Sequence, residues 1–129
     1  MVSVNGGNLS IKQGTNLCIT RSGSRLGYLD ESDMIVTGVD KDDENTRKAS
    51  SELGVHRAIY TKTLSTAIVH SHSIHTTALS FRSDKIFPPV PIIGFGSEPV
   101  PGGFASEVAE ALKTNLWCWY TGTAALPEV

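Results

Sequence analysis

The sequence predicts one α/β domain built in layers, and three observations lead to this prediction. Its 129 residues are enough for one hydrophobic core and too few for two domains. Short segments typical of β-strands alternate along the chain with segments whose apolar residues have helical spacing. We find no internal repeat and no low-complexity linker, and mixed strands and helices in this order are typical of layered α/β folds.

Composition and charge exclude several classes of partner. A hydrophobic fraction of 40% with 19% charged residues is ordinary for a soluble globular protein. The net charge is -2 without a long run of either sign, so we expect no nucleic-acid partner, which would require a basic patch. No apolar run approaches the roughly 20 residues of a membrane span, and no signal peptide is recognisable, so we expect no membrane partner. Cys18 and Cys118 form no pairing pattern, which predicts a reduced, cytoplasmic protein.

The N-terminal segments predict three strands. Residues 8–12 and 16–20 form a hairpin pattern, with QGT between them as the turn. Residues 33–39 predict a third strand, and the polar segment 40–49 predicts a surface loop.

A helix is predicted over residues 50–60. Ser50 and Ser51 are suited to cap its N-terminus, and apolar side chains follow at near-helical spacing. Gly54 weakens this helix without excluding it. A strand rich in β-branched residues is predicted to follow over 66–70.

The rest of the chain continues the alternation. Residues 74–81 predict a short helix and residues 91–95 a strand. The clearest helical pattern covers residues 102–112, where Phe104, Val108 and Leu112 share one face.

Three of the four histidines lie where the strand over 66–70 ends. Side chains alternate between the two faces of a strand, so His70 and His72 are expected to project to the same face. Two imidazoles at this spacing can share one divalent cation, as in many zinc sites. The alternative is a pair of solvent-facing histidines at a strand end. His75, on the following turn, is expected to have a structural role or to support a ligand.

The start of the predicted helix carries a second group of polar residues. Glu52 and His56 are four residues apart and are therefore neighbours on a helix face. The helix dipole favours a carboxylate in the first turn, so helix stabilisation alone explains Glu52. Ser50 and Ser51 are capping candidates, but hydroxyl and N–H groups at a helix start also suit a phosphate.

Two glycine-containing turns, residues 5–10 and 20–23, flank the predicted hairpin. Ser22 and the backbone N–H of Gly23 are placed to receive an anion. Plain turns without a ligand are the alternative.

Taken in order, five segments resemble the class II aldolase/adducin family: GGNLSIK, LCITRSG, SSELGVHRAIY, AIVHSHSIHTTALS and GGFASEVAEAL. The resemblance depends on the order and spacing of all five, because none is specific alone. It implies a partial family domain over residues 1–116, with a three-layer α/β/α fold and a mixed, largely antiparallel central sheet.

The resemblance also implies a functional site. His70 and His72 would bind zinc or another divalent metal, and Glu52 would be the catalytic acid/base. The substrate-binding residues would be Asn8, Ser22, Gly23, Ser50 and Ser51, which would hold the substrate phosphate. The implied reaction is cleavage of a sugar phosphate, such as a ketose 1-phosphate, to dihydroxyacetone phosphate and an aldehyde. The family also implies a homo-oligomer, specifically a tetramer.

Other activities on this scaffold remain open. A sugar-phosphate 4-epimerase or a dehydratase would share the metal and phosphate sites, and the sequence does not separate them. A non-catalytic, adducin-like interaction domain is a further alternative, against which the presence of Glu52, His70 and His72 argues.

Residues 117–129 form an atypical tail that departs from the family pattern. The family has a third histidine ligand after the helix that matches residues 104–112, where this chain has WCWYTGT. Read from the third base of the Trp117 codon, the codons of WCWY specify Val-Leu-Val, and the next codons permit His-Gly-His-Gly. We therefore interpret the tail as an out-of-frame translation, and a genuinely divergent tail is the alternative. The family's leading helix and C-terminal helical region also lack a counterpart. We therefore expect a truncated chain, weak metal binding and little activity, because catalytic zinc normally has three protein ligands.

Overall fold

The computed structural model describes residues 6–72, 92–94, 103–114 and 119–121. Its strands are β1 (Gly7–Gln13), β2 (Asn16–Thr20), β3 (Met34–Gly38), β4 (Ala67–Ser71), β5 (Ile92–Gly94) and β6 (Trp119–Thr121). Its α-helices are α1 (Leu53–Lys62) and α3 (Gly103–Ala111), and its short 3-10 helices are η1 (Leu26–Tyr28), η2 (Glu31–Asp33) and η3 (Thr46–Lys48). The predicted helix over 74–81 and His75 lie outside the described residues.

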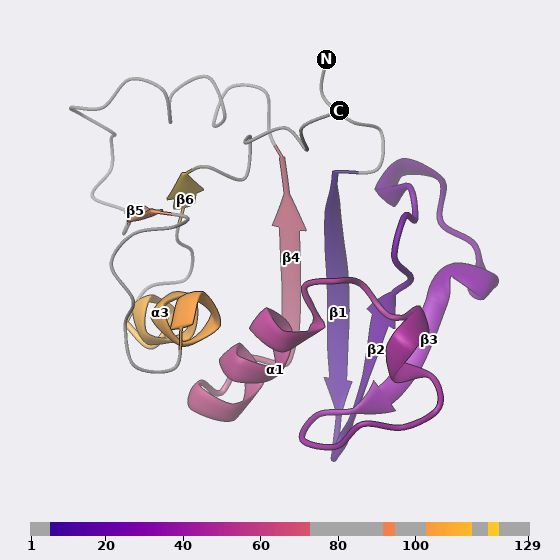
Figure 1. Ribbon diagram of the computed structural model, residues 1–129, viewed down its shortest axis with the longest axis horizontal. Helices are drawn as coiled ribbons and strands as arrows, with labels where there is room; N and C mark the ends of the chain where they lie inside the picture. The colour runs from indigo at the N-terminus through magenta and orange to yellow at the C-terminus, as the bar shows by residue number, and fades with distance from the viewer. Residues whose placement is uncertain (1–5, 73–91, 95–102, 115–118, 122–129) are drawn as a thin grey trace.

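Four strands form an antiparallel sheet in the order β3-β2-β1-β4 (Figure 1). The predicted hairpin is confirmed, since Gln13 pairs with Asn16 across the two-residue turn that joins β1 and β2. The strand predicted over 33–39 is confirmed as β3 and the one over 66–70 as β4. Since β4 pairs with β1, the histidine segment lies beside the N-terminal glycine turn, although about 60 residues separate them.

Two short strands form a separate parallel pair, β5 and β6. The strand predicted over 91–95 is confirmed as β5. The strand β6 was not predicted, and it falls within the tail over 117–129, most of which lies outside the described residues.

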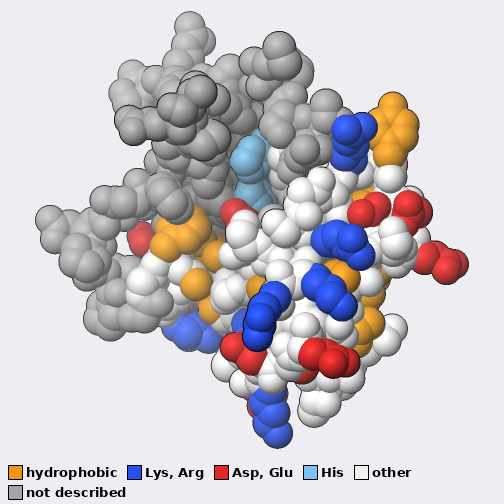
Figure 2. Space-filling view, turned by 45° about the vertical axis from the view of Figure 1, so that its right-hand side comes forward, with side chains coloured by type: hydrophobic (Ala, Val, Ile, Leu, Met, Phe, Trp, Pro, Cys, Tyr) orange, Lys and Arg blue, Asp and Glu red, His pale blue; other side chains and the backbone are white. Residues whose placement is uncertain are grey.

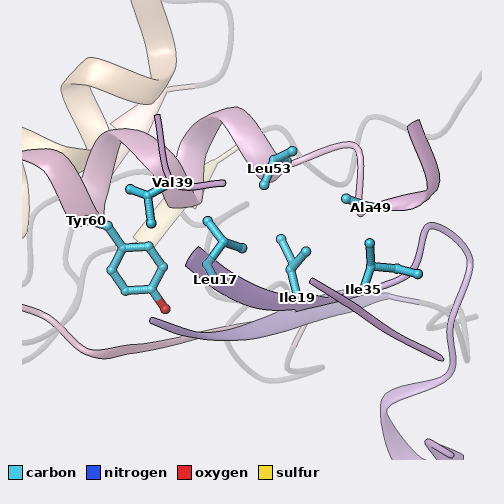
Figure 3. Close-up of a cluster of buried hydrophobic side chains, with 7 residues drawn as sticks. All are labelled: Leu17, Ile19, Ile35, Val39, Ala49, Leu53 and Tyr60. Carbon is cyan, nitrogen blue, oxygen red and sulfur yellow. The ribbon is translucent and has the colours of Figure 1, made fainter. Parts of the chain in front are cut away.

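The main core lies between the antiparallel sheet and helix α1 (Figure 3). Leu17 and Ile19 of β2 are fully buried, as expected for alternate residues that face the core. Leu53 and Tyr60 of α1 cover them. Burying these side chains supplies the main hydrophobic contribution to stability, at about 25 cal/mol for each Å² of apolar surface removed from water.

A second apolar cluster joins α1 to α3. Ile59 of α1 contacts Val108 and Ala109 of α3, and all three side chains are buried. Phe104 and Leu112 pack against the same cluster, so the helix predicted over 102–112 and its apolar face are confirmed.

Helix α1 begins later than predicted, at Leu53 rather than at residue 50. The N-cap position is Glu52, whose side chain makes no capping hydrogen bond. Ser50 precedes the helix, and its hydroxyl accepts a hydrogen bond from the backbone N–H of Glu52. The serines are therefore not at the predicted N-cap position, although the Ser50 hydroxyl does accept a backbone N–H just before the helix. The backbone N–H of Ser50 is bonded to Thr20 of β2.

The α/β class and the largely antiparallel sheet are confirmed. Within the described residues, α1 and α3 supply one helical layer on the sheet face that holds the core (Figure 1). None of the described helices is long and apolar enough to cross a membrane.

Candidate functional site

The pairing of β1 with β4 places Asn8 directly opposite His70. Gly7 makes this close approach possible, since it has a φ of +110° and an added Cβ would overlap the backbone carbonyl oxygen of His70. Glu52, just before α1, lies against the same end of the two strands. Three predicted site residues from separate segments therefore meet at one point.

The Glu52 carboxylate is the centre of this cluster. Its Oε2 lies 2.5 Å from Nδ1 of His70 and accepts a hydrogen bond from Nδ2 of Asn8 at 3.0 Å. Partial burial raises the pKa of Glu52, but the hydrogen bonds from His70 and Asn8 outweigh burial and hold that pKa below its usual value. Glu52 is therefore ionised at neutral pH, as a general base must be.

His72 lies next to His70, with the ring centroids 4.7 Å apart. The residues of β4 alternate between exposed and half-buried, with His70 in the half-buried set, and His72, directly after the strand, is also half-buried, in agreement with a shared face. Burial lowers the pKa of His72, with a further contribution from the charge of His70, so its imidazole is neutral and able to bind a metal at pH 7. Among the described residues no group of three or more His, Cys, Asp or Glu side chains is arranged to hold a metal ion.

His56 is part of the same cluster, although we did not assign it a functional role from the sequence. It is 1% exposed, and its Nε2 lies 2.5 Å from Oδ1 of Asn8. Its other ring nitrogen, Nδ1, lies 2.6 Å from the Ser10 hydroxyl, which in turn contacts the Tyr60 hydroxyl at 2.8 Å. The four-residue spacing from Glu52 was the available signal, but it does not reveal that Asn8 bridges the two side chains.

The serine-containing segments form a second part of the site. The backbone N–H of Ser50 donates to the carbonyl of Thr20, and that of Ser22 donates to the carbonyl of Lys48. These bonds hold the turn over 20–23 against the segment that leads into α1, so Ser22 and Gly23 lie close to Ser50 and Ser51. Asn8 forms no hydrogen bond with these serines within the described residues, and its side chain is bonded to the Glu52 cluster instead.

Several donors in these segments remain available to an anion. Ser50 is largely buried and its hydroxyl is bonded to the Glu52 backbone. The backbone N–H groups of Gly23 and Ser51, by contrast, form no hydrogen bond within the described residues, and neither do the hydroxyls of Ser22 and Ser51. Gly23 has a φ of +80°, a conformation that favours glycine and that occurs in anion-binding backbone turns.

An open pocket adjoins these serines. It has a volume of about 410 Å³ and is lined by Arg21, Ser22, Arg47 and Lys48. None of the three cations forms an ion pair within the described part of the chain. Figure 2 shows several Lys and Arg side chains on one face, interspersed with Asp and Glu side chains, and histidine side chains are visible on the same face. The pocket therefore provides a positive potential beside hydroxyl and N–H donors.

Comparison with known proteins identifies the family. The profile of the Class II Aldolase and Adducin N-terminal domain matches residues 1–119. An L-fuculose phosphate aldolase of Methanococcus maripaludis is 42% identical over 83 residues, which cover 63% of this chain and 45% of that protein. A 3-oxo-tetronate 4-phosphate decarboxylase of Cupriavidus necator is 32% identical over 89 residues, which cover 65% and 41% of the two chains.

Solved structures support the same assignment. The crystal structure of an L-fuculose-1-phosphate aldolase from Thermus thermophilus superimposes with a TM-score of 0.79 at 28% identity, covering 94% of this chain and 67% of that one. The chain spans about half the length of the curated relatives that it matches. The chain belongs to the class II aldolase and adducin family.

Proposed function

We propose that this chain carries the metal, acid–base and phosphate residues of an aldolase that cleaves a sugar phosphate, such as L-fuculose 1-phosphate, and depends on a divalent metal. The observation that carries the proposal is the contact of the Glu52 carboxylate with His70, whose ring lies next to that of His72, beside serines that adjoin a basic pocket. The relatives that are named as L-fuculose phosphate aldolases support the substrate class.

His70 and His72 are the proposed zinc ligands. Their adjacent rings and the low pKa of His72 fit nitrogen donors for a divalent cation, and the two side chains supply part of a site that normally has three protein ligands. When bound, zinc supplies positive charge that stabilises negative charge developing on the substrate oxygens. A third ligand has to come from outside the described residues, where the family resemblance implies a histidine after α3.

Glu52 is the proposed acid/base. Its carboxylate is ionised and accepts hydrogen bonds from Asn8 and His70, which fix its position next to the metal ligands. A carboxylate held in this way can accept a proton from a substrate hydroxyl or carbon and return it to the product.

The substrate phosphate is proposed to lie at Ser22, Gly23, Ser50 and Ser51. The hydroxyls of Ser22 and Ser51 and the backbone N–H groups of Gly23 and Ser51 are the donors for its oxygens. Arg21, Arg47 and Lys48 add a favourable potential for a dianion. The phosphate role proposed for Asn8 stays a prediction, because its amide is bonded to Glu52 and His56 in this structure.

Zinc binding is the first test of this proposal. We expect the purified chain to bind zinc weakly, and the substitutions His70→Asn and His72→Asn each to reduce the affinity about tenfold or more, since each removes one ligand. Isothermal titration at neutral pH measures the effect, with Glu44→Gln, at an exposed position outside the site, as the control. Equal zinc binding by His72→Asn and the unaltered chain would exclude His72 as a ligand.

Phosphate binding tests the second part of the site. Inorganic phosphate is expected to shift the backbone amide resonances of Ser22, Gly23 and Ser51 in a saturable way. The double substitution Arg47→Gln with Lys48→Gln should weaken binding about tenfold, because each charged hydrogen bond contributes roughly 1.5–3 kcal/mol when desolvated and less at an exposed site. The double substitution Lys41→Gln with Lys113→Gln removes the same two charges from exposed positions outside the pocket and should change the affinity little. An equal loss in the control would show only a general charge effect.

The reaction itself is tested by assaying cleavage of ketose 1-phosphates with added zinc. We expect little cleavage by the 129-residue chain, and recovery in an extended chain in which residues after 116 continue as VLVHGHG and the family's terminal helical regions are present. Decarboxylation, dehydration or 4-epimerisation products would assign the protein to another activity of the family, in line with the decarboxylase relative.

We also propose that the protein is cytoplasmic and forms a homo-oligomer. Measuring the molecular size of the extended chain in solution would test the oligomer.

A further inference from the structure

A chain of hydrogen bonds leads from the core to the Glu52 carboxylate. It passes from Tyr60 to Ser10, His56 and Asn8, with heavy-atom distances of 2.8, 2.6 and 2.5 Å, and reaches Glu52 after a further 3.0 Å. The four side chains before Glu52 are at most 5% exposed. Water is therefore largely excluded, and each bond must pair one donor with one acceptor.

The contact between Asn8 and Glu52 determines the direction of every bond in this chain. Oε2 of Glu52 accepts from the amide nitrogen Nδ2 of Asn8, so the carbonyl oxygen Oδ1 of Asn8 faces His56. This oxygen also only accepts, so Nε2 of His56 must carry a proton.

The remaining two bonds follow from the charge of His56. Burial lowers the pKa of His56 to about 4, against the attraction of Glu52, so the ring is neutral at pH 7. A neutral ring with a proton on Nε2 has none on Nδ1, so Nδ1 accepts from the Ser10 hydroxyl. The oxygen of Ser10 then accepts from the Tyr60 hydroxyl, which completes the chain.

We propose that His56 is a positioning residue for Glu52: as the Nε2–H tautomer, whose Nδ1 accepts from Ser10, it holds the Asn8 amide in the orientation that donates to the carboxylate. The opposite amide orientation would place Oδ1 of Asn8 against the carboxylate and the amide nitrogen against a second N–H. Both contacts would then be lost and replaced by repulsion between like partners. His56 does not touch the position proposed for the substrate, so it acts only through Asn8. The inference uses the proposed function only for the role of Glu52.

Nuclear magnetic resonance can observe the tautomer directly in the metal-free chain. Long-range proton–nitrogen correlation spectra of the ¹⁵N-histidine-labelled protein should show one protonated nitrogen in His56, assigned to Nε2, at pH 7. The Tyr60→Phe substitution keeps the ring in the core and removes the last donor, so it should shift the Nδ1 resonance of His56 and leave the tautomer unchanged. A proton on Nδ1, or on both nitrogens at pH 7, would overturn the inference.

Two substitutions of His56 test whether it positions Asn8. His56→Gln retains a side-chain N–H that can reach Oδ1 of Asn8, whereas His56→Leu fills similar space without a donor. The side-chain amide protons of Asn8 should keep their shifts in the first variant. In the second they should shift and exchange with solvent about tenfold faster, because a hydrogen bond is lost. Circular dichroism confirms that each variant is folded.

Identical Asn8 amide spectra for folded His56→Leu and the unaltered chain would refute the positioning role. Where a His56 variant does not fold, the Tyr60→Phe and tautomer measurements still decide the question. These spectra require neither zinc nor substrate, so they keep their meaning even if the chain proves to have no aldolase activity. Conversely, zinc binding by His70 and His72 does not depend on whether His56 positions Asn8.

Discussion

Replacing Glu52 by Gln is expected to lower the rate of sugar-phosphate cleavage by about 100- to 10,000-fold, the usual contribution of a general acid or base. Glutamine has nearly the same shape and can accept hydrogen bonds through its carbonyl oxygen, but it cannot take up the proton. The carboxylate that it replaces is ionised and held by Asn8 and His70. The loss should therefore appear in kcat, while binding of the substrate phosphate persists.

The measurement uses the extended chain, because the proposed metal site needs a third ligand in addition to His70 and His72. Glu44→Gln is the matched control, since Glu44 is exposed and lies outside the site, and it should leave the rate unchanged. Zinc content should stay the same in both variants, because Glu52 is proposed as a base and not as a ligand. Retained turnover in Glu52→Gln, or loss of zinc from it, would require a different role for this residue.

Acidification from pH 6.5 to about 4 is expected to destabilise the chain by up to about 3 kcal/mol through His56 alone. Its pKa of about 4 in the folded state lies below the ordinary value of 6.5, and each pKa unit corresponds to about 1.4 kcal/mol. Between these two values the unfolded chain binds a proton at His56 and the folded chain does not. The contribution of neutral His56 to the free energy of unfolding is therefore fully present above pH 6.5, and it decreases as the pH drops towards 4. The lowered pKa of His72 acts in the same direction.

Urea unfolding at several pH values between 7 and 4 measures this effect on the 129-residue chain, and the proton resonances of His56 report its pKa directly. The physical cause is burial, since the charged ring would lose its hydration and would have to reverse the bond to Ser10. A His56 resonance that titrates near pH 6.5, with a free energy of unfolding that is constant down to pH 4.5, would contradict the prediction.

The sequence by itself determined the local elements and the residue types of the site. The hairpin, β3, β4, β5 and α3 were predicted because their signals are local, such as the hairpin turn, the β-branched residues of β4 and the 3.6-residue period of α3. The alternation of side chains along a strand predicted that His70 and His72 share a face. Glu52 and the serines were found through a family resemblance that depends on order along the chain. The pairing of β6 with β5 was missed, because contacts between distant segments leave no periodic signal.

Only the tertiary structure decided how these residues work together. The antiparallel register of β1 and β4 places Asn8 against His70, and the late start of α1 brings Glu52 to both. His56 shows the difference most clearly. Its spacing from Glu52 was visible in the sequence, but its contact with Asn8 depends on a strand 48 residues away. Burial then makes a charged His56 ring unfavourable, and each hydrogen-bonding neighbour has to act as either a donor or an acceptor. Both effects arise in the folded interior and cannot be read from one segment of the sequence.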